Sequence, residues 1–367
     1  MKIVKIEAIP FKIPYKKPLK YGVAGYDIAA EHVLIEIKTD EEINGIAEAI
    51  PRQTIYGESQ ASILYAVKKW FAPMLIGEKA YNIEIIWDKI NKIVGNTTVK
   101  GAIDVALHDI LGKKAGLPLC KLIGGYKEKI EVGYMIGIDT LENMFQEALY
   151  LRGKGIRNFK VKVGKNVKKD IELIKLLREN MGDEITIYVD ANQAYTIEEA
   201  IQAIKKMQEY NIKLIEEPVA CWNIRGKKRI AQISQIPIMA DESAITPQLV
   251  LNEIENGTAG AFSVKIPRTG IRNSRLIIHL AEQNGIPCLI GTQSETSIGA
   301  RAAIHVAAAF KNVSLPSEIS FFTNLKDEIV KNPLKLENGF VKVPEENGVG
   351  TIIDHDKLNN YKVKIEL

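Results

Sequence analysis

The chain of 367 residues is longer than one typical domain and matches the length of an α/β barrel of about 250 residues joined to one further domain. Its content of 46% hydrophobic and 26% charged residues is that of an average soluble globular protein. The 49 Lys and Arg residues exceed the 45 Asp and Glu residues only slightly and form no basic run, which argues against a nucleic-acid partner and suits a small anionic substrate.

The first 50 residues are predicted to form an antiparallel meander. The strand over 3–14 begins with an alternation that charges interrupt, so it lacks the apolar core of a secretion signal. Further strands are expected over 32–38 and through Ala47, with a turn at 40–45, while 16–29 shows no clear period. No apolar run of about 18 residues occurs, so we expect no membrane span.

Residues 57–116 are predicted to be helical. The clearest helix covers 96–116, where small and apolar side chains recur every three or four residues and Gly116 is suited to end the helix. Because the strands precede these helices instead of alternating with them, the N-terminal part is expected to be an α+β domain.

From about Lys129 onward, strands and helices are predicted to alternate. The pattern indicates a (β/α)8-type barrel, a modified TIM barrel of the α/β class, over 127–339. An α+β capping domain is expected over 1–126, with the tail 340–367 packing back on it. The predicted barrel strands are 131–137, 158–163, 185–190, 212–216, 236–241, 261–265, 287–291 and the region around 313–318.

Charged residues end five successive strands of this predicted barrel, at intervals of 28, 26, 25 and 24 residues counted from the second lysine. One strand, one crossover helix and two loops take about that length. Because barrel active sites are assembled at the carboxyl ends of the strands, we expect these side chains to meet. They are Lys160, Lys162, Asp190, Glu216, Asp241 and Lys265.

Three carboxylates flanked by lysines on both sides indicate a divalent metal with bases around it. Mg²⁺ prefers hard oxygen ligands, and one oxygen each from Asp190, Glu216 and Asp241 leaves positions for a substrate carboxylate. A single Lys-Val-Lys is most often a solvated strand edge, and a single Asp after a strand is most often a helix cap. Their joint occurrence at five successive strand ends favours the functional interpretation.

These residues also carry a resemblance that extends over almost the whole chain. Several short motifs occur in the order and at the spacing expected of barrel strands. Together they resemble the enolase superfamily and, within it, the muconate-lactonizing (mandelate racemase/muconate cycloisomerase) subgroup. The specific segments are 160–162, 190–192, 216–218, 240–243 and Lys265, with 45–49, 102–109, 122–125 and 348–350 in addition.

The resemblance implies a reaction. The superfamily removes a proton from the carbon next to a carboxylate and forms an enediolate, and its general pattern is a Lys or His base with Mg²⁺ on that species. The three carboxylates are thereby expected to bind Mg²⁺, with Mn²⁺ as an alternative. The resemblance assigns Lys162 as the base with Lys160 beside it, and it places Lys265 on the other face of the substrate.

The predicted strands seven and eight bear on which reaction is catalysed. Segment 290–295 lacks the His that mandelate racemases have there, and 317–320 lacks the Asp-x-Asp with which dipeptide epimerases hold a substrate ammonium. Glu318 followed by hydrophobic residues resembles muconate cycloisomerases more closely. Two departures border the pocket: Glu217 stands where the subgroup usually has Gln, and Gly270-Ile271 stands where it often has Gly-Gly.

A muconate cycloisomerase-like isomerase is therefore the favoured function. A racemase or epimerase of an N-acylamino acid, a dipeptide or a proline derivative is the alternative, and a related lyase or dehydratase is its near neighbour. A catalytically silent barrel that acts as a binding protein is a remote alternative, because five buried charges without metal or substrate are unfavourable.

Substrate contacts are expected from both domains. In the superfamily the small domain covers the barrel mouth, and the loops 21–26 and 52–58 match that region. Tyr26, Ile55 and Tyr56 are expected to cover an apolar body, and either Arg52 or Lys20 to pair with a distal carboxylate. From the barrel we expect Gln293, Glu295 and Glu318 to contact substrate, and Asn192 and Glu242 to stand behind the ligands.

The remaining expectations concern compartment and partners. Cys120, Cys221 and Cys288 are odd in number and far apart, which argues against a disulfide framework and fits a reducing cytoplasm. We expect a small carboxylate-containing substrate, a homo-oligomer, and no nucleic-acid or membrane partner.

Overall fold

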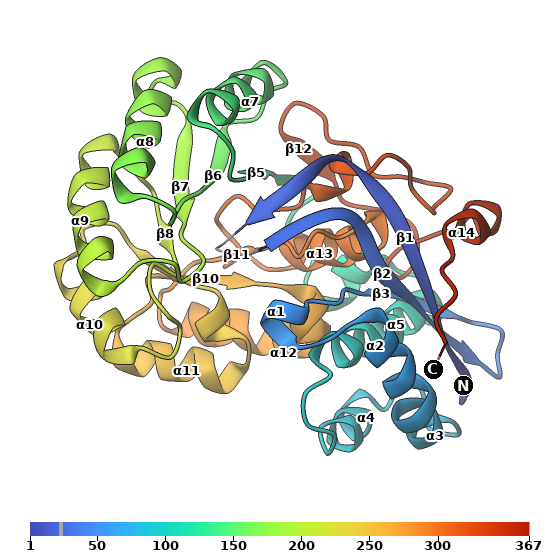
Figure 1. Ribbon diagram of the computed structural model, residues 1–367. Coiled ribbons are helices and arrows are strands. Elements are labelled where there is room, and N and C mark those ends of the chain that lie inside the picture. Colours follow the sequence, from blue (N-terminus) through green and yellow to red (C-terminus); the bar gives the residue numbers. More distant parts are fainter. Residues whose placement is uncertain (22–24, 367) are drawn as a thin grey trace.

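The computed structural model describes residues 1–21 and 25–366, so residues 22–24 of the predicted loop 21–26 lie outside the described part. A curled sheet of parallel strands with helices outside it forms the barrel, and an antiparallel sheet with several helices forms the cap (Figure 1). None of the described helices is both long and apolar enough to cross a membrane.

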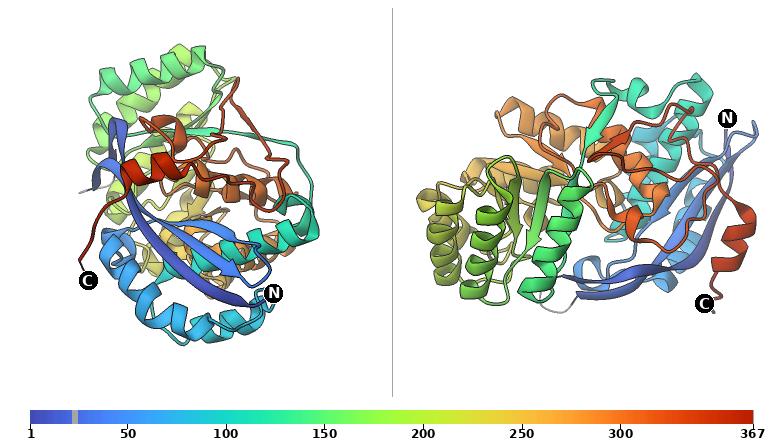
Figure 2. Two further views of the ribbon diagram at one scale, coloured as in Figure 1. Left: turned by 90° about the vertical axis from the view of Figure 1, so that its right-hand side faces the viewer. Right: turned by 90° about the horizontal axis from the view of Figure 1, so that it is seen from above.

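The cap sheet has the order β1-β2-β3 and is antiparallel throughout. Its strands are β1 (Ile3–Tyr21), β2 (Gly25–Thr39) and β3 (Gly45–Ala49). The long β1 and β2 extend over 16–21 and 25–29, the described parts of a stretch in which the sequence shows no period (Figure 2). Leu19 pairs with Asp27 and Lys20 with Tyr26. Backbone pairing with a neighbouring strand does not require alternating side chains, which explains why the pattern underestimated these strands.

The cap helices follow the sheet, as the sequence predicts for an α+β domain. The predicted helix 96–116 is α5, and Gly116 ends it in a left-handed conformation with φ 67°. The helices are α1 (Gln53–Tyr56), α2 (Gln60–Ala66), the π-helical turn η1 (Val67–Phe71), α3 (Ala72–Leu75), α4 (Ile83–Ile90), α5 (Thr97–Ala115) and α6 (Leu119–Ile123).

The barrel sheet is parallel and has the order β11-β10-β9-β8-β7-β6-β5. The eighth strand predicted around 313–318 is not a regular strand, yet this segment closes the barrel: Glu318 N–H donates to Ile290 O, and Gly133 N–H donates to Ser317 O, each at 2.8 Å. The strands are β5 (Gly133–Ile136), β6 (Asn158–Lys162), β7 (Thr186–Asp190), β8 (Ile215–Glu216), β9 (Ile238–Ala240), β10 (Ala261–Val264) and β11 (Cys288–Ile290).

The barrel helices pack apolar faces against the sheet. In α9 the buried residues Ala200, Ala203, Ile204 and Met207 share one face, and a capping box of Thr196 and Glu199 begins the helix. The helices and short turns are α7 (Leu141–Gly153), α8 (Val167–Met181), α9 (Ile197–Met207), η2 (Gln208–Tyr210), α10 (Ile224–Ile233), η3 (Glu242–Ala244), α11 (Pro247–Asn256), α12 (Ile266–Gln283), α13 (Ser297–Ala309) and η4 (Phe321–Asn324).

The cap touches the barrel closely where α5 crosses the start of α12. A Cβ on Gly101 of α5 would lie 2.3 Å from Pro267 O, so this approach requires glycine. Beyond it, the carboxylate of Asp104 accepts the backbone N–H of Ile271 at 2.5 Å. The turn between them passes through Gly270, at φ 62° and ψ −170°. The cap helix therefore holds the segment that follows β10.

The C-terminal tail contacts both parts of the molecule. Strand β12 (Phe340–Lys342) pairs antiparallel with β4 (Lys129–Glu131). Helix α14 (His355–Tyr361) then lies beside β1, and Val363 N–H donates to Pro10 O at 2.9 Å (Figure 2). The boundaries 1–126 for the cap and 127–339 for the barrel remain our proposal for dividing the chain.

Candidate active site

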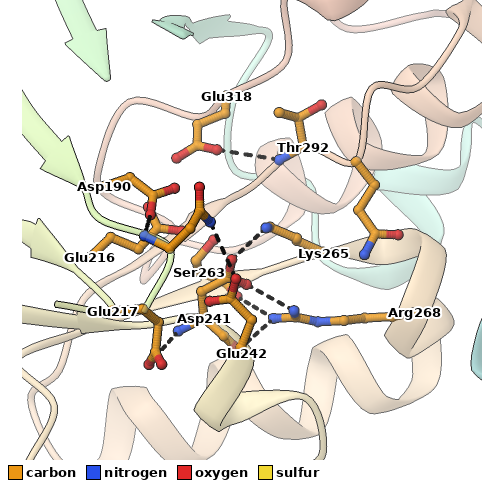
Figure 3. Close-up of polar contacts among 12 residues, drawn as sticks. Asp190, Glu216, Glu217, Asp241, Glu242, Ser263, Lys265, Arg268, Thr292 and Glu318 are labelled. Atoms are coloured by element: carbon orange, nitrogen blue, oxygen red, sulfur yellow. Dashed lines mark hydrogen bonds and ion pairs between the residues drawn. The ribbon is translucent and has the colours of Figure 1, made fainter. Parts of the chain in front are cut away.

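The carboxyl ends of the barrel strands bring the charged residues of the sequence pattern to one edge of the sheet. Lys162 lies opposite Asp190 in the register of β6 with β7, and Asp190 lies opposite Glu216 in that of β7 with β8. Asp241 follows β9 and Lys265 follows β10. Figure 3 shows Asp190, Glu216, Asp241 and Lys265 gathered in one place.

Two of the carboxylates share the ammonium groups that come from β6. Lys160 Nζ lies 2.9 Å from Asp190 Oδ2 and 2.6 Å from Glu216 Oε2. Lys162 Nζ donates to Asp190 Oδ2 at 2.6 Å. Burial acts to raise the pKa of Asp190, but the two lysines outweigh it and lower the pKa to about 2. Burial, and after it the charge of Asp190, raises the pKa of Glu216 well above its ordinary value.

The third carboxylate is held by cations from the segment after β10. Lys265 Nζ donates to Asp241 Oδ2 at 2.5 Å, and Arg268 Nη1 lies 2.8 Å from Asp241 Oδ1. Arg268 is itself buried and also donates to Ser263 O. Burial opposes the ionised form of Asp241, but Lys265 and Arg268 hold its pKa well below the ordinary range. Asp241 is therefore a fixed anion.

The carboxylates fit a hard divalent cation by their chemistry, although their present spacing is not that of a ligand cluster. Within residues 1–21 and 25–366, no group of three or more His, Cys, Asp or Glu side chains is spaced to hold a metal ion. Lysine ammonium groups lie between the carboxylates instead. Glu216 Oε1 is nevertheless buried with no hydrogen bond and no ion pair among the described residues, whereas Glu216 Oε2 and Asp241 Oδ1 are engaged by Lys160 and Arg268. Oxygens of this kind are what Mg²⁺ binds.

The lysines approach the carboxylates from two sides. Lys162, on β6, precedes the three strands that carry or precede the carboxylates in the sheet order, and Lys265 follows them. Lys160 is the deepest, at 1% exposed, whereas Lys162 and Lys265 are 7% and 9% exposed. Lys162 and Lys265 therefore stand at opposite ends of the row of three strands that carry or precede the carboxylates.

Asn192 and Glu242 connect Lys162 to the turn after β9. Asn192 Oδ1 accepts from Lys162 Nζ at 2.7 Å, and Asn192 Nδ2 donates to Glu242 Oε1 at 3.2 Å. Burial, and after it Asp241, raises the pKa of the Glu242 carboxyl. Asn192 thus contacts Lys162 directly, whereas the sequence predicted that it would lie behind the carboxylates.

Glu318 contacts Lys160 from the last barrel segment. It is buried, and its Oε2 accepts from Lys160 Nζ at 3.0 Å while its Oε1 accepts from the Tyr188 hydroxyl at 3.0 Å. The backbone N–H of Thr292 also points to it, at 3.4 Å (Figure 3). These contacts favour a role in holding the Lys160 ammonium over direct contact with substrate.

The segment after β11 joins the barrel to the cap loop. Gln293 donates from Nε2 to the Tyr56 hydroxyl, and its backbone oxygen accepts from Arg52. Arg52 also donates to Asp27 Oδ2 at 2.9 Å. Glu295 accepts from Gln293 N–H at 2.8 Å and so shapes the turn from within. Arg52 and Tyr56 therefore bind the cap loop to Gln293 of the barrel, and Glu295 is buried.

Tyr26 borders a cavity between the cap hairpin and the barrel. The side chain is 59% exposed, and the cavity has a volume of about 310 Å³. Thr292, whose N–H points to Glu318, lines the same cavity, which places the cavity next to the lysine and carboxylate cluster. Its other lining residues include Lys20, Tyr134, Met135 and Phe321.

Sequence reasoning missed three buried polar residues of this region. Tyr188 stands two positions before Asp190, so the two-residue period of a strand places both on one face, and that signal was available. Arg268 follows Lys265 by three residues at the start of α12. Lys227 is only 2% exposed on α10, and nothing in the sequence around it indicates burial.

Family models match both parts of the chain. Residues 5–124 match the N-terminal domain of mandelate racemase / muconate lactonizing enzyme, and residues 143–357 match the enolase C-terminal domain-like family. The solved muconate lactonizing enzyme from Mycobacterium smegmatis, complexed with muconolactone, superimposes with a TM-score of 0.96 at 38% identity, over 99% of this chain and 100% of that chain.

Other relatives act on amino-acid derivatives. The N-succinyl-L-Arg/Lys racemase of Bacillus cereus is 32% identical over 99% of this chain and 98% of its own length. The dipeptide epimerase of Enterococcus faecalis, solved with Mg and the dipeptide L-Leu-L-Tyr, has a TM-score of 0.92 at 33% identity, over 96% of this chain and 100% of that chain. From its matching domains and relatives, the chain belongs to the enolase superfamily and, within it, to the mandelate racemase/muconate lactonizing enzyme group of isomerases.

Proposed function

We propose that this protein is a Mg²⁺-dependent isomerase that makes or breaks a bond to hydrogen next to a substrate carboxylate, with muconate cycloisomerisation as its reaction. The observation that carries the proposal is the arrangement of Lys162 and Lys265 on either side of three buried carboxylates. Glu318, paired with Lys160, takes the place at the last barrel segment where an Asp-x-Asp would bind a substrate ammonium.

In this proposal Asp190, Glu216 and Asp241 hold the cation. A cation held there would act as a Lewis acid and would stabilise negative charge that develops on the substrate carboxylate. Among the protein residues, Lys160 is kept charged by its carboxylate neighbours and adds a further positive charge to the site.

The proton moves through a lysine. In the lactonising direction, one carboxylate oxygen of a muconate adds to the carbon–carbon double bond and leaves an enediolate at the other carboxyl group. A lysine ammonium then donates its proton to the α-carbon, which completes the lactone, and the free amine takes up a proton from solvent. In this proposal either Lys162 or Lys265 makes this transfer, and the reaction needs only one of them.

Racemisation or epimerisation of an N-acylamino acid or dipeptide is the second candidate. Removal and return of a proton on opposite faces of one carbon need two bases, and the positions of Lys162 and Lys265 on either side of the carboxylate-bearing strands support such a pair. The relatives from Bacillus cereus and Enterococcus faecalis act on such derivatives. For a free N-terminal amine, however, the last barrel segment offers Glu318 already engaged by Lys160 and Tyr188.

A substrate panel in D₂O with Mg²⁺ tests the proposal. Muconates, N-succinylamino acids, dipeptides and proline derivatives are each incubated with the protein and followed by mass spectrometry for deuterium at the α-carbon and for new products. We expect deuterated lactone from cis,cis-muconate. Exchange only into an N-acylamino acid would favour the second candidate, loss of water would indicate a dehydratase, and no exchange into any member would support the binding protein. The homo-oligomer and the cytoplasmic location remain predictions.

A further inference from the structure

Glu217 is a buried carboxyl group that the proposed mechanism does not use. It follows the ligand Glu216 at the end of β8, is fully buried, and has a positive φ of 33°. Figure 3 shows its side chain directed away from Asp190. It stands where the muconate-lactonizing subgroup usually has Gln, which makes the choice of a carboxylate here a property of this chain.

The Glu217 carboxylate bonds to two residues of the turn that carries Asp241. Its Oε1 accepts the backbone N–H of Asp241 at 3.3 Å and the hydroxyl of Ser243 at 2.5 Å. Asp241 has φ −124° and ψ −80°, outside both the strand and the helix regions, at the point where β9 turns into η3. A backbone in this conformation persists only where its surroundings determine it. The bonds from Glu217 are part of that determination.

Lys227 brings a buried positive charge to the same place. It is 2% exposed, and its Nζ lies 2.5 Å from Ser243 Oγ, 2.7 Å from Glu253 Oε2 and 3.4 Å from Glu217 Oε1. Buried ion pairs are weak sources of stability, because apolar residues of the same volume often serve as well, whereas the loss of one partner is strongly unfavourable. Stability alone therefore does not account for three charged side chains packed beneath the ligand turn.

We propose that Glu217 is a positioning residue for Asp241 and that Lys227 is its buried counter-ion. This inference rests on the proposed function, in which Asp241 is a cation ligand. Glu217 acts through its acceptor oxygen: it ties the N–H of Asp241 to the Ser243 hydroxyl, and so sets where the Asp241 carboxylate stands relative to Lys265. Lys227 keeps the extra carboxylate compatible with burial.

Two variants of equal side-chain length separate the acceptor from the charge. Glu217→Gln keeps an acceptor oxygen and loses the charge, whereas Glu217→Met loses both. In metal-free protein, amide hydrogen exchange of the peptide that contains 241–244 is followed by mass spectrometry. Glu217→Met is expected to speed this exchange about ten-fold or more, which corresponds to the loss of one hydrogen bond to a charged group, and Glu217→Gln to change it by less than about three-fold.

Mg²⁺ calorimetry on the same proteins supplies the second measurement. We expect the Kd for Mg²⁺ to rise about ten-fold in Glu217→Met and to stay within about three-fold in Glu217→Gln. Equal weakening in both variants would mean that Glu217 acts by charge, and unchanged values in both would mean that it has no influence; either outcome overturns the proposal. A native protein that fails to bind Mg²⁺ contradicts the proposed function instead, and the exchange measurement still decides on the positioning role.

The counter-ion role is tested by a double-mutant cycle in melting temperature. Lys227→Met leaves Glu217 and Glu253 buried without a cation, so it is expected to lower the melting temperature of the native protein. In the Glu217→Gln background only Glu253 is left without a cation. Lys227→Met should therefore lower the melting temperature clearly less there than in the native protein. Equal effects in the two backgrounds would exclude Lys227 as the counter-ion of Glu217.

Discussion

At the residue scale, substitution of Lys162 or Lys265 should have different effects in the different candidate reactions. If both enantiomers of a substrate are processed, Lys162 and Lys265 each serve as base for one of them, since they stand on opposite sides of the carboxylates. Lys162→Ala should then lose α-deuterium exchange with one enantiomer and Lys265→Ala with the other. General acid–base catalysis contributes about 10²–10⁴-fold, so losses of that size are expected in single-turnover experiments.

A cycloisomerase or lyase gives another outcome with the same variants. Only one lysine transfers the proton, and the other acts through its charge, so one variant loses exchange altogether while the other loses turnover but retains exchange. Two variants with exchange close to the native rate on a confirmed substrate would show that neither lysine is the base.

His305 is a residue whose protonation should affect stability and not catalysis. It is buried in α13; its Nδ1 accepts the backbone N–H of Cys120 and its Nε2 donates to Val349 O, each at 3.2 Å, so the ring is a neutral tautomer. Burial, and after it the charge of Arg301, lowers the pKa of His305 to about 4. The unfolded chain takes up this proton near pH 6.5, so the stabilisation is complete above about pH 6.5 and is lost as the pH falls toward 4.

This linkage predicts a loss on the order of 3 kcal/mol of unfolding free energy from this residue between pH 6.5 and 4. Urea unfolding at pH 7 and at pH 4.5 measures it. In His305→Gln, which does not titrate, the difference between the two pH values should be smaller by about that amount. The same pH dependence in both proteins would show that His305 is not protonated on unfolding.

At the scale of elements, the junction of α5 with α12 determines where the segment after Lys265 lies. Gly270 has φ 62° and ψ −170°, a conformation that side chains disfavour, and a Cβ there would lie 2.6 Å from Asp104 Oδ2. Gly270→Ala is therefore expected to destabilise the protein by about 1–3 kcal/mol and to reduce activity, because the turn after Lys265 must move.

Gly257→Ala is the matched control for that prediction. Gly257 also has a positive φ, 63°, at the end of α11, but a Cβ there would meet no atom within 4 Å. Denaturant unfolding should show a clearly smaller loss for Gly257→Ala, without loss of activity. Because Gly257 has ψ 32° and Gly270 has ψ −170°, equal losses would show that neither the rarer backbone conformation of Gly270 nor its contact with Asp104 adds to the cost of a positive φ.

At the scale of the whole molecule, cation binding should stabilise the fold. Asp190, Glu216 and Asp241 place three buried carboxylates together, and burial with the charge of Asp190 raises the pKa of Glu216. A bound divalent cation relieves this repulsion and adds binding free energy to the folded state only. The melting temperature should rise with Mg²⁺ concentration, and excess EDTA should lower it and abolish activity.

Two comparisons make that measurement specific. Asp241→Asn should blunt the response to Mg²⁺, and replacing Mg²⁺ by Na⁺ at equal ionic strength should give none. An unchanged melting temperature together with full activity in excess EDTA would remove the assignment of these carboxylates as metal ligands.

Much of the fold and of the site follows from local sequence. Each barrel strand before a site residue is a short apolar run, and a charge that directly follows such a run must stand at the carboxyl end of a strand, as Asp190 and Lys265 do. The periodicity of 96–116 predicts α5 to within two residues. These features involve residues close together in the chain, so the sequence is sufficient to determine them.

The tertiary structure decided what depends on partners far apart in the chain. The extension of β1 over 16–21 and of β2 over 25–29 depends on their pairing with each other, and the irregular closing segment around Glu318 is held by bonds to β11 and β5. The partners of Glu318, Lys160 and Tyr188, are 158 and 130 residues away. Burial of Glu217 with Lys227 likewise depends on α10 bringing Lys227 to the end of β8. Periodicity describes only one element at a time, and these contacts arise where several elements meet.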